Sequence, residues 1–322
     1  MNQKTKLAFT FPGQGSQSVG MGKELADAFV SARSVFEEVD DALSQNLSHL
    51  MWDGPMEDLT MTANTQPALM ACSLAVMRVL KQDFDVDVSV ASYVAGHSLG
   101  EYSALCAAGS LSLSETAKLL RLRGEAMQIA VPVGEGAMAA LLGADLDVAA
   151  KVVAAGAQLG VCQIANDNAN GQVVISGTKK AVDAAIETAN ELGVRRAVLL
   201  PVSAPFHCEL MAPAAEAMAD ALADTDLKAP IVPVVNNVTA EAVSDPIQLK
   251  TDLVTQVTGQ VRWRESVTWM AENRDGDGIE TFVEPGTGKV LTGMLRRIVK
   301  GVDGVALSTP EALERFAEML NG

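Results

Sequence analysis

Apolar and polar positions follow two patterns along this chain, one typical of buried strands and one typical of amphipathic helices. Residues 6–11 form an apolar run that leads into Pro12-Gly13-Gln14-Gly15, which predicts a buried strand followed by a turn. Residues 24–43 carry apolar side chains at spacings of four and three and predict one helix. Residues 65–80 predict another helix, and the β-branched run 88–94 predicts a strand. Strands alternating with helices are typical of a parallel sheet covered on both faces.

The order of elements changes after residue 131. The predicted elements are then a strand at 136–142, a helix at 145–155, strands at 161–166 and 172–176, a helix at 179–192 and a strand at 196–200. This βαββαβ order is that of the ferredoxin-like unit. We therefore predict an α/β protein with a larger discontinuous domain, residues 1–131 and 200–322, and an inserted small domain, residues 132–199.

A serine lies between the second predicted strand and a predicted helix at residues 101–108, in Gly96-His97-Ser98-Leu99-Gly100. A sharp strand-to-helix turn holds such a serine in a strained conformation, and glycines two residues to either side make room for the backbone. The amide of Leu99, near the helix N-terminus, would then point toward a developing oxyanion. An ordinary serine in a glycine-flanked turn is the alternative, but the strand-turn-helix context favours a nucleophile.

The chain has only three histidines, so a general base can be sought by elimination. His49 lies far from any loop of interest, and His97 adjoins Ser98 in a tight turn where neighbouring side chains diverge. His207 follows a predicted strand on a loop, which suits a general base; a structural histidine is the alternative. No acidic residue is marked by its motif as the third member of a triad, so a backbone carbonyl could orient His207 instead.

Composition and charge narrow the class of protein. The chain has 322 residues, of which 48% are apolar and 20% charged, as in ordinary globular proteins. We find no signal sequence in the polar start of the chain and no run of 18 apolar residues, so we expect no membrane association. Four dispersed cysteines without a CxxC pair favour free thiols in a reducing cytoplasm, and we expect no metal site. A net charge of −16 argues against nucleic acid as a partner.

Several separated motifs make a resemblance specific. They are Phe11-Pro12-Gly13-Gln14-Gly15-Ser16-Gln17, Gly96-His97-Ser98-Leu99-Gly100-Glu101-Tyr102, Arg123-Gly124, Gly171-Gln172-Val173-Val174-Ile175-Ser176-Gly177 and the stretch 202–207. In this order they closely resemble the malonyl-CoA:acyl carrier protein transacylases, over nearly the whole chain. The resemblance implies a hydrolase-like α/β domain with an inserted ferredoxin-like domain. It also implies ping-pong transfer of malonyl from malonyl-CoA to the phosphopantetheine thiol of acyl carrier protein, through acyl-Ser98 and without a cofactor, for fatty-acid synthesis.

The resemblance also implies roles for individual residues. The carbonyl of Gln256 would orient His207, and the amides of Gln14 and Leu99 would form the oxyanion hole. Arg123 would pair with the free carboxylate of malonyl, a planar bidentate contact that lysine would not reproduce; a surface arginine is the alternative. Phe206 would lie beside the α-carbon of the acyl group, and its bulk would disfavour an α-methyl. Met127 and Asn168 are further candidates for the substrate cleft, although a helical methionine is more often part of the core.

Two alternatives and a docking hypothesis remain open at this point. The same chemistry would serve a serine esterase or thioesterase, although a simple esterase has no need of Arg123. A non-catalytic subunit that binds carrier protein is the second alternative. An acidic carrier would need local cations, and the candidates are Lys179-Lys180, Arg195-Arg196 and Arg296-Arg297-Lys300, of which the last could share one helix face. Arg121 lies two positions before Arg123, on the opposite face of the predicted helix, and should be solvated. Nothing in the sequence demands more than a monomer.

Overall fold

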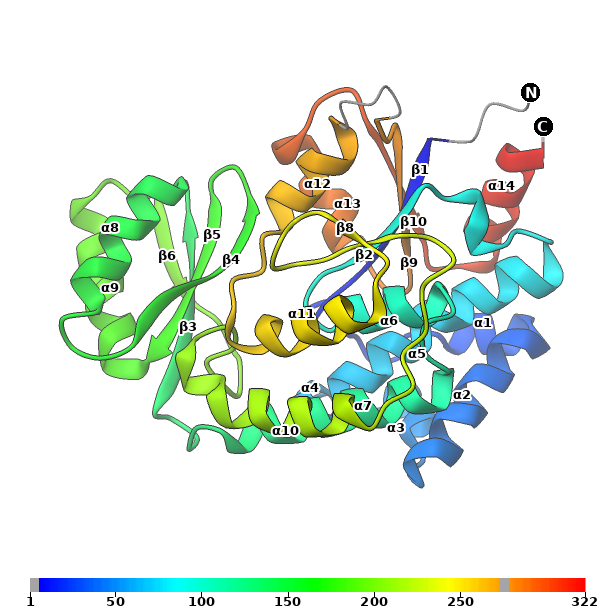
Figure 1. Cartoon of the computed structure of the whole chain (residues 1–322), viewed down its shortest axis with the longest axis horizontal. Coiled ribbons are helices and arrows are strands. Elements are labelled where there is room, and N and C mark those ends of the chain that lie inside the picture. Colours follow the sequence, from blue (N-terminus) through cyan, green and yellow to red (C-terminus); the bar gives the residue numbers. More distant parts are fainter. Residues whose placement is uncertain (1–5, 273–277, 322) are drawn as a thin grey trace.

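The structure, a computed structural model, describes residues 6–272 and 278–321. The polar residues 1–5, which weighed against a signal sequence, lie outside the described residues. The described chain forms two units side by side, each built on its own sheet (Figure 1). No helix in these two ranges is long and apolar enough to cross a membrane.

The larger unit contains a six-stranded sheet with the order β10-β9-β1-β2-β7-β8. Its strands are β1 (Leu7–Phe11), β2 (Tyr93–Gly96), β7 (Val234–Val235), β8 (Ala242–Val243), β9 (Thr281–Pro285) and β10 (Asp303–Leu307). All neighbouring strands are parallel except β7 and β8, which are antiparallel. The predicted parallel-sheet core of an α/β protein is therefore confirmed.

Both faces of this sheet are buried, as the apolar run of β1 predicts. Phe9 and Phe11 belong to the main hydrophobic core, whereas Ala8 between them belongs to a second core that contains Trp263. Successive side chains of a strand point to opposite faces, so both layers of helices must bury apolar surface against β1. The carboxyl ends of the parallel strands then lie at one edge of the sheet, where ligands of such folds commonly bind.

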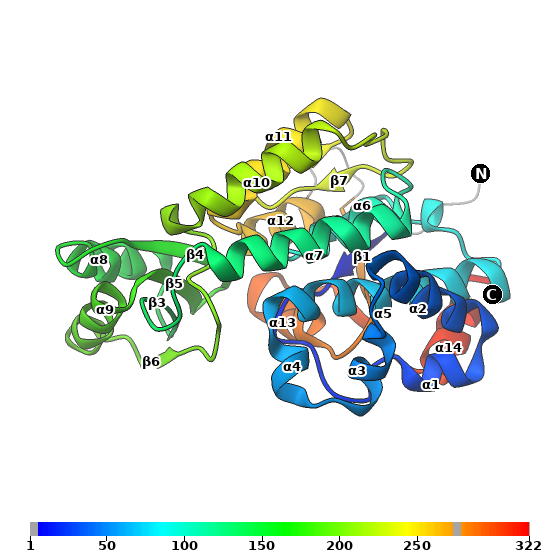
Figure 2. The same cartoon turned by 90° about the horizontal axis from the view of Figure 1, so that it is seen from below.

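Helices cover the sheet on both sides (Figures 1 and 2). They are α1 (Lys23–Ala28), α2 (Val30–Leu43), α3 (Leu47–Asp53), α4 (Met56–Thr60), α5 (Thr62–Asp83), α6 (Gly100–Ala107), α7 (Leu113–Ile129), α10 (Ala212–Ala223), α11 (Pro246–Thr258), α12 (Trp263–Ala271), α13 (Val290–Ile298) and α14 (Pro310–Asn321), with two short 3₁₀ turns, η1 (Val88–Val90) and η2 (Glu209–Met211). The long α7 runs toward the smaller unit, and α10 packs along it (Figure 2).

The smaller unit has a four-stranded antiparallel sheet with the order β4-β5-β3-β6. Its elements, in chain order, are β3 (Gly136–Leu142), α8 (Leu146–Gly156), β4 (Cys162–Ala169), β5 (Gln172–Thr178), α9 (Lys179–Glu191) and β6 (Arg196–Leu199). Helices α8 and α9 cover the face turned away from the larger unit (Figure 1). Ala139 and Leu141 pack against these helices, whereas Met138 and Ala140, which alternate with them along β3, pack against the main core.

Two predicted elements of the larger unit are wrong in detail. The helix predicted at 24–43 is interrupted at Phe29, whose extended backbone separates α1 from α2. The ring of Phe29 packs edge-on against Phe84, a tertiary contact that periodicity cannot reveal. The strand predicted at 88–94 begins only at Tyr93, because the side chain of Asp87 accepts the amide of Ser89 and starts a 3₁₀ turn instead.

Candidate active site

A strand-to-helix turn presents Ser98 at the carboxyl end of β2. Ser98 has a left-handed backbone conformation with φ 54°, and α6 begins two residues later. A Cβ atom at Gly96 would lie 1.9 Å from backbone atoms of Gly100, and one at Gly100 would lie 2.2 Å from the carbonyl oxygen of Phe11. Only glycine fits at these two positions, which is the steric reason for the spacing predicted from the sequence.

His207 is the histidine that reaches the serine. Its Nε2 lies 2.8 Å from Ser98 Oγ, and its Nδ1 lies 2.8 Å from the carbonyl oxygen of Gln256. Because a carbonyl can only accept, Nδ1 carries the proton and Nε2 is left with a lone pair toward the serine. The structure thus brings together Ser98, His207 and the Gln256 carbonyl, in the arrangement that the resemblance implied.

The other two histidines face elsewhere. His97 Nε2 lies 2.8 Å from Asn168 Oδ1, and the His97 ring packs at 5.7 Å from the ring of Trp263. His49 lies on α3 at the surface and contacts Asp53. Neither side chain is directed at Ser98, which agrees with the elimination made from the sequence.

Arg123 is a buried cation at the bottom of this site. Its side chain is 1% exposed and donates from Nη2 to Ser98 Oγ at 3.2 Å and to Gln256 Oε1 at 2.8 Å. Nη1 donates to Gln66 Oε1 at 2.9 Å, and the guanidinium lies over the ring of Tyr102. Within residues 6–272 and 278–321, no carboxylate forms an ion pair with Arg123, and its Nε has no hydrogen-bond partner. A buried cation with neutral partners can receive a carboxylate from a ligand.

Burial controls the protonation of His207. Desolvation, followed by the positive charge of Arg123, lowers the pKa of His207 to about 3. His207 is therefore neutral near pH 7 and can accept a proton from Ser98. A ligand carboxylate that neutralised Arg123 would weaken one of the causes that lower this pKa and make His207 a stronger base.

A buried polar network beneath the serine was not predicted. The side-chain amide of Gln256 donates to the Ser98 carbonyl at 3.0 Å and to Glu101 Oε2 at 2.9 Å. Asn237 accepts the Ser98 amide at 2.7 Å, donates to the carbonyl of Gly96 at 2.7 Å, and gives its own amide to Glu101 at 3.0 Å. Burial raises the pKa of Glu101 to about 7. Of this network, only Glu101 could have been singled out in the sequence, because it directly follows the serine motif. Nothing in the sequence pointed to Asn237 or to a role for the side-chain amide of Gln256.

The two residues implied for the oxyanion hole lie on adjacent loops. Leu99 is the residue at the N-terminus of α6, and Gln14 follows β1, which pairs in parallel with β2. The loops nearly touch, since a Cβ at Gly13 would lie 2.7 Å from the His97 carbonyl oxygen. Adjacent parallel strands thus place both residues at the same edge of the sheet, and the oxyanion role of their amides stays a prediction.

The remaining candidates lie around this centre. Phe206 precedes His207 and is buried, and Met127 accepts a weak hydrogen bond at 3.7 Å from Gln66, the partner of Arg123. Asn168 is linked to the site by its contact with His97.

The solvated position expected for Arg121 is wrong, because its guanidinium is half-buried and bonds to Gln45 and Asn64. The shared helix face expected for Arg296, Arg297 and Lys300 is also wrong, because α13 ends at Ile298.

Comparisons with known proteins agree with one another. Residues 8–306 match the family described as acyl transferase domain. The chain is 44% identical over 317 residues to the malonyl CoA-acyl carrier protein transacylase of Bacillus subtilis (strain 168), covering 98% of each. Its fold is similar to the crystal structure of acyl-carrier-protein-S-malonyltransferase from Bartonella henselae, with a TM-score of 0.95, 55% identity and coverage of 98% and 99%. It is also similar to a malonyl-transacylase solved in complex with its type II PKS acyl-carrier protein, with a TM-score of 0.93, 40% identity and coverage of 97% and 99%.

Proposed function

The chain belongs to the acyl transferase domain family, and on this basis we propose how its residues carry out the reaction. It is an acyltransferase that transfers malonyl from malonyl-CoA to acyl carrier protein. The observation that carries the residue assignment is the contact of Ser98 Oγ with both His207 and the buried Arg123. A nucleophile, a base and an anion receptor meet at one atom.

In the first half-reaction, Ser98 Oγ attacks the thioester carbonyl of malonyl-CoA as His207 Nε2 takes the hydroxyl proton. The amides of Leu99 and Gln14 hold the oxyanion of the tetrahedral intermediate. The carbon–sulfur bond then breaks, and coenzyme A leaves with the proton from His207. In the second half-reaction, His207 takes the proton of the phosphopantetheine thiol, whose sulfur attacks malonyl-Ser98. The Ser98 oxygen leaves and recovers the proton, so neither half-reaction requires a cofactor or metal.

The Gln256 carbonyl supports the base in both half-reactions. Its hydrogen bond with Nδ1 keeps the lone pair on Nε2 and stabilises the imidazolium that forms after proton transfer. A carbonyl carries less charge than the carboxylate of a triad. Desolvation of the buried His207, rather than its hydrogen bond with the carbonyl, therefore keeps the base neutral in the free enzyme.

Arg123 selects the acyl group in this proposal. Its bonds to Ser98 Oγ and Gln256 Oε1 can be exchanged for the malonyl carboxylate, which places the thioester carbonyl beside the nucleophile. The buried Phe206, beside His207, would crowd a branched α-carbon. Acetyl-CoA offers no carboxylate and would gain nothing from the arginine.

The smaller unit, in this proposal, is a ferredoxin-like insertion that forms one wall of the carrier cleft. Its βαββαβ order and antiparallel sheet support this assignment. Arg297 on α13 donates to Gln172 on β5 at 2.6 Å, so the Arg296-Arg297 cluster lies where the units meet and is well placed for an acidic carrier. We also propose that the enzyme works as a monomer in the cytoplasm for fatty-acid synthesis, where its four free thiols would remain reduced.

Intact-protein mass spectrometry tests the assignment. The protein is incubated with malonyl-CoA, its mass is measured, and acyl carrier protein bearing phosphopantetheine is then added. We expect one malonyl adduct, mapped to Ser98 after digestion, that moves to the carrier. Carrier without phosphopantetheine is the matched control, because it can dock but has no thiol to accept the acyl group.

Each alternative predicts a different mass record. An adduct that decays to free malonate at the same rate with or without the carrier would identify a thioesterase. A protein that binds the carrier but never gains mass would be a non-catalytic binding subunit. An adduct on a residue other than Ser98 would overturn the nucleophile assignment.

A further inference from the structure

Residues 261–266, here called the anchor segment, touch both units of the protein. The segment leads into α12 and pairs with β4 of the smaller unit through a parallel bridge between Val261 and Asn166. The amide of Asp167 donates to the Val261 carbonyl at 2.9 Å, and the amide of Val261 donates to the Ala165 carbonyl at 2.8 Å. The smaller unit is thus joined to the larger one by backbone hydrogen bonds at this point.

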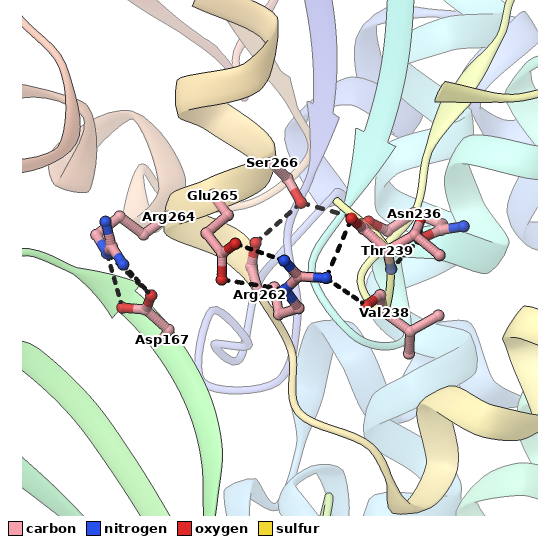
Figure 3. Close-up of polar contacts among 8 residues, drawn as sticks. All are labelled: Asp167, Asn236, Val238, Thr239, Arg262, Arg264, Glu265 and Ser266. Atoms are coloured by element: carbon pink, nitrogen blue, oxygen red, sulfur yellow. Dashed lines mark hydrogen bonds and ion pairs between the residues drawn. The ribbon is translucent and has the colours of Figure 1, made fainter. Parts of the chain in front are cut away.

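A bidentate ion pair reinforces the junction. Arg264 Nε lies 3.0 and 2.9 Å from the two carboxylate oxygens of Asp167, and its Nη2 lies 2.8 Å from one of them. Figure 3 shows the two side chains facing each other between β4 and α12. The Asp167 side chain is only 1% exposed, so Arg264 is the group that compensates its buried charge.

The opposite side of the anchor segment holds the loop that carries Asn237. The amide of Arg262 donates to the Asn237 carbonyl at 2.9 Å. The Arg262 guanidinium donates to the carbonyls of Val238 and Thr239 at 3.0 and 3.1 Å and is oriented by Glu265 (Figure 3). This side of the segment therefore fixes the residue that accepts the Ser98 amide.

Both residues at the centre of the serine turn are held through this segment. Asn168, next to Asp167 on β4, bonds to His97, and the His97 ring also packs against Trp263, next to Arg264. Asn237 holds the Ser98 amide. A non-glycine residue in the left-handed region is strained and persists only where its surroundings hold it, and Ser98 is such a residue.

We propose that Arg264 and Asp167 are positioning residues for the acyl transfer: their ion pair fixes β4 so that Asn168 holds His97 and keeps Ser98 in its reactive conformation. The inference rests on the proposed function for its kinetic readout, but not for its structural one. Without Arg264, the buried Asp167 carboxylate loses its counter-ion, so that either β4 shifts toward solvent or Asp167 takes up a proton. In either case the ion pair no longer fixes β4, and we expect Asn168 to move away from His97. The substitution would thus act on a residue more than 160 positions from Arg264 in sequence.

The first test reads the His97 contact without any substrate. The ¹⁵N resonances of the imidazoles are recorded for the wild type, Arg264→Met, Asp167→Asn and Asn168→Ala. With three histidines in the chain, His97→Gln assigns the His97 signals. We expect Arg264→Met and Asp167→Asn to shift the His97 nitrogens in the direction that Asn168→Ala does. Lys179→Met, which breaks the exposed Lys179–Asp183 ion pair of the same unit, is the matched control and should leave them unchanged.

The second test is a double-mutant cycle on the rate of Ser98 acylation by malonyl-CoA. Arg264→Met and Asn168→Ala should each slow acylation about tenfold, and the double variant should be no slower than the worse single variant, because both act through one contact. Arg264→Lys, which keeps the charge without the bidentate geometry, should restore part of the rate. Thermal melting shows whether each variant is folded. If Arg264→Met does not fold, the isosteric Asp167→Asn replaces it in the cycle.

Two results would overturn the inference. One is an unchanged His97 spectrum in both ion-pair variants, since Asn168 would then keep its place without the pair. The other is strictly additive losses in the cycle, which would indicate two independent effects. A wild-type protein that malonyl-CoA does not acylate would refute the proposed function instead, and the spectra would still decide the role of the ion pair.

Discussion

Replacing Arg123 by alanine removes the buried cation at Ser98 and separates malonyl transfer from acetyl transfer. The guanidinium has neutral partners, Gln66, Gln256 and Ser98, so the free enzyme loses hydrogen bonds but no ion pair. The malonyl complex loses its counter-ion. Leaving one member of a buried ion pair without its partner costs about 3 to 5 kcal/mol, which corresponds to a fall in kcat/KM on the order of 10²- to 10⁴-fold.

Acetyl-CoA should respond differently to Arg123→Ala. Its acyl group has no carboxylate, and water can occupy the space left by the guanidinium and bond to the freed amide oxygens, so we expect a change within about tenfold. Arg123 also contributes to the lowered pKa of His207, and its removal raises that pKa. The acidic limb of the pH–rate profile for acetylation should therefore move to higher pH.

Quenched-flow acylation followed by intact mass measurement, run in parallel with malonyl-CoA and acetyl-CoA, gives both rate constants for each variant. Arg121→Ala is the matched control, because that arginine lies on the same helix but bonds to Gln45 and Asn64 rather than to Ser98. It should leave the malonyl-to-acetyl ratio unchanged. Equal losses on both substrates in Arg123→Ala would refute the reasoning and would make Arg123 a structural residue.

Three further predictions follow from the same geometry. Ser98→Ala should lower malonyl transfer by on the order of 10³-fold or more without unfolding the protein, as timed transfer assays and circular dichroism can check. His207 is neutral in the folded state, because its pKa is lowered from 6.5 to about 3. The unfolded chain therefore binds more protons between these two values. The contribution of His207 to the free energy of unfolding is fully present above about pH 6.5 and is lost as the pH falls toward 3. His207→Gln should reduce the slope of unfolding free energy against pH in that window by up to about 1.4 kcal/mol per unit, measured by urea titration, and an unchanged slope would contradict a buried neutral base. Charge reversal to glutamate at Arg296, Arg297 and Lys300 should raise the apparent KM for the acyl carrier and weaken its salt dependence, with self-acylation unchanged; carrier kinetics that do not move would exclude docking at this cluster.

Features that depend on neighbouring residues could be predicted from the sequence. The strand at 136–142 has its predicted bounds, and the serine turn lies between a strand and a helix as its spacing indicated. His207 could be selected because the chain has only three histidines. Of the two failures, only the one at Asp87 was local in origin, because a capping side chain starts a 3₁₀ turn there. The break at Phe29 accompanies a tertiary contact with Phe84.

By itself, the sequence determined the order of helices and strands in the two units, the candidate residues Ser98 and His207, and the motifs that carry the family resemblance. Tertiary structure decided which distant polar groups meet at Ser98. The Gln256 amide, Asn237 and Glu101 form one buried network, with 155 positions between Gln256 and Glu101 and 136 between Asn237 and Glu101. Such contacts depend on strand order and on the crossing of helices over the sheet, which no local pattern encodes. Burial then changes their chemistry, because a histidine, a glutamate and an arginine removed from water no longer titrate as they would in the free chain.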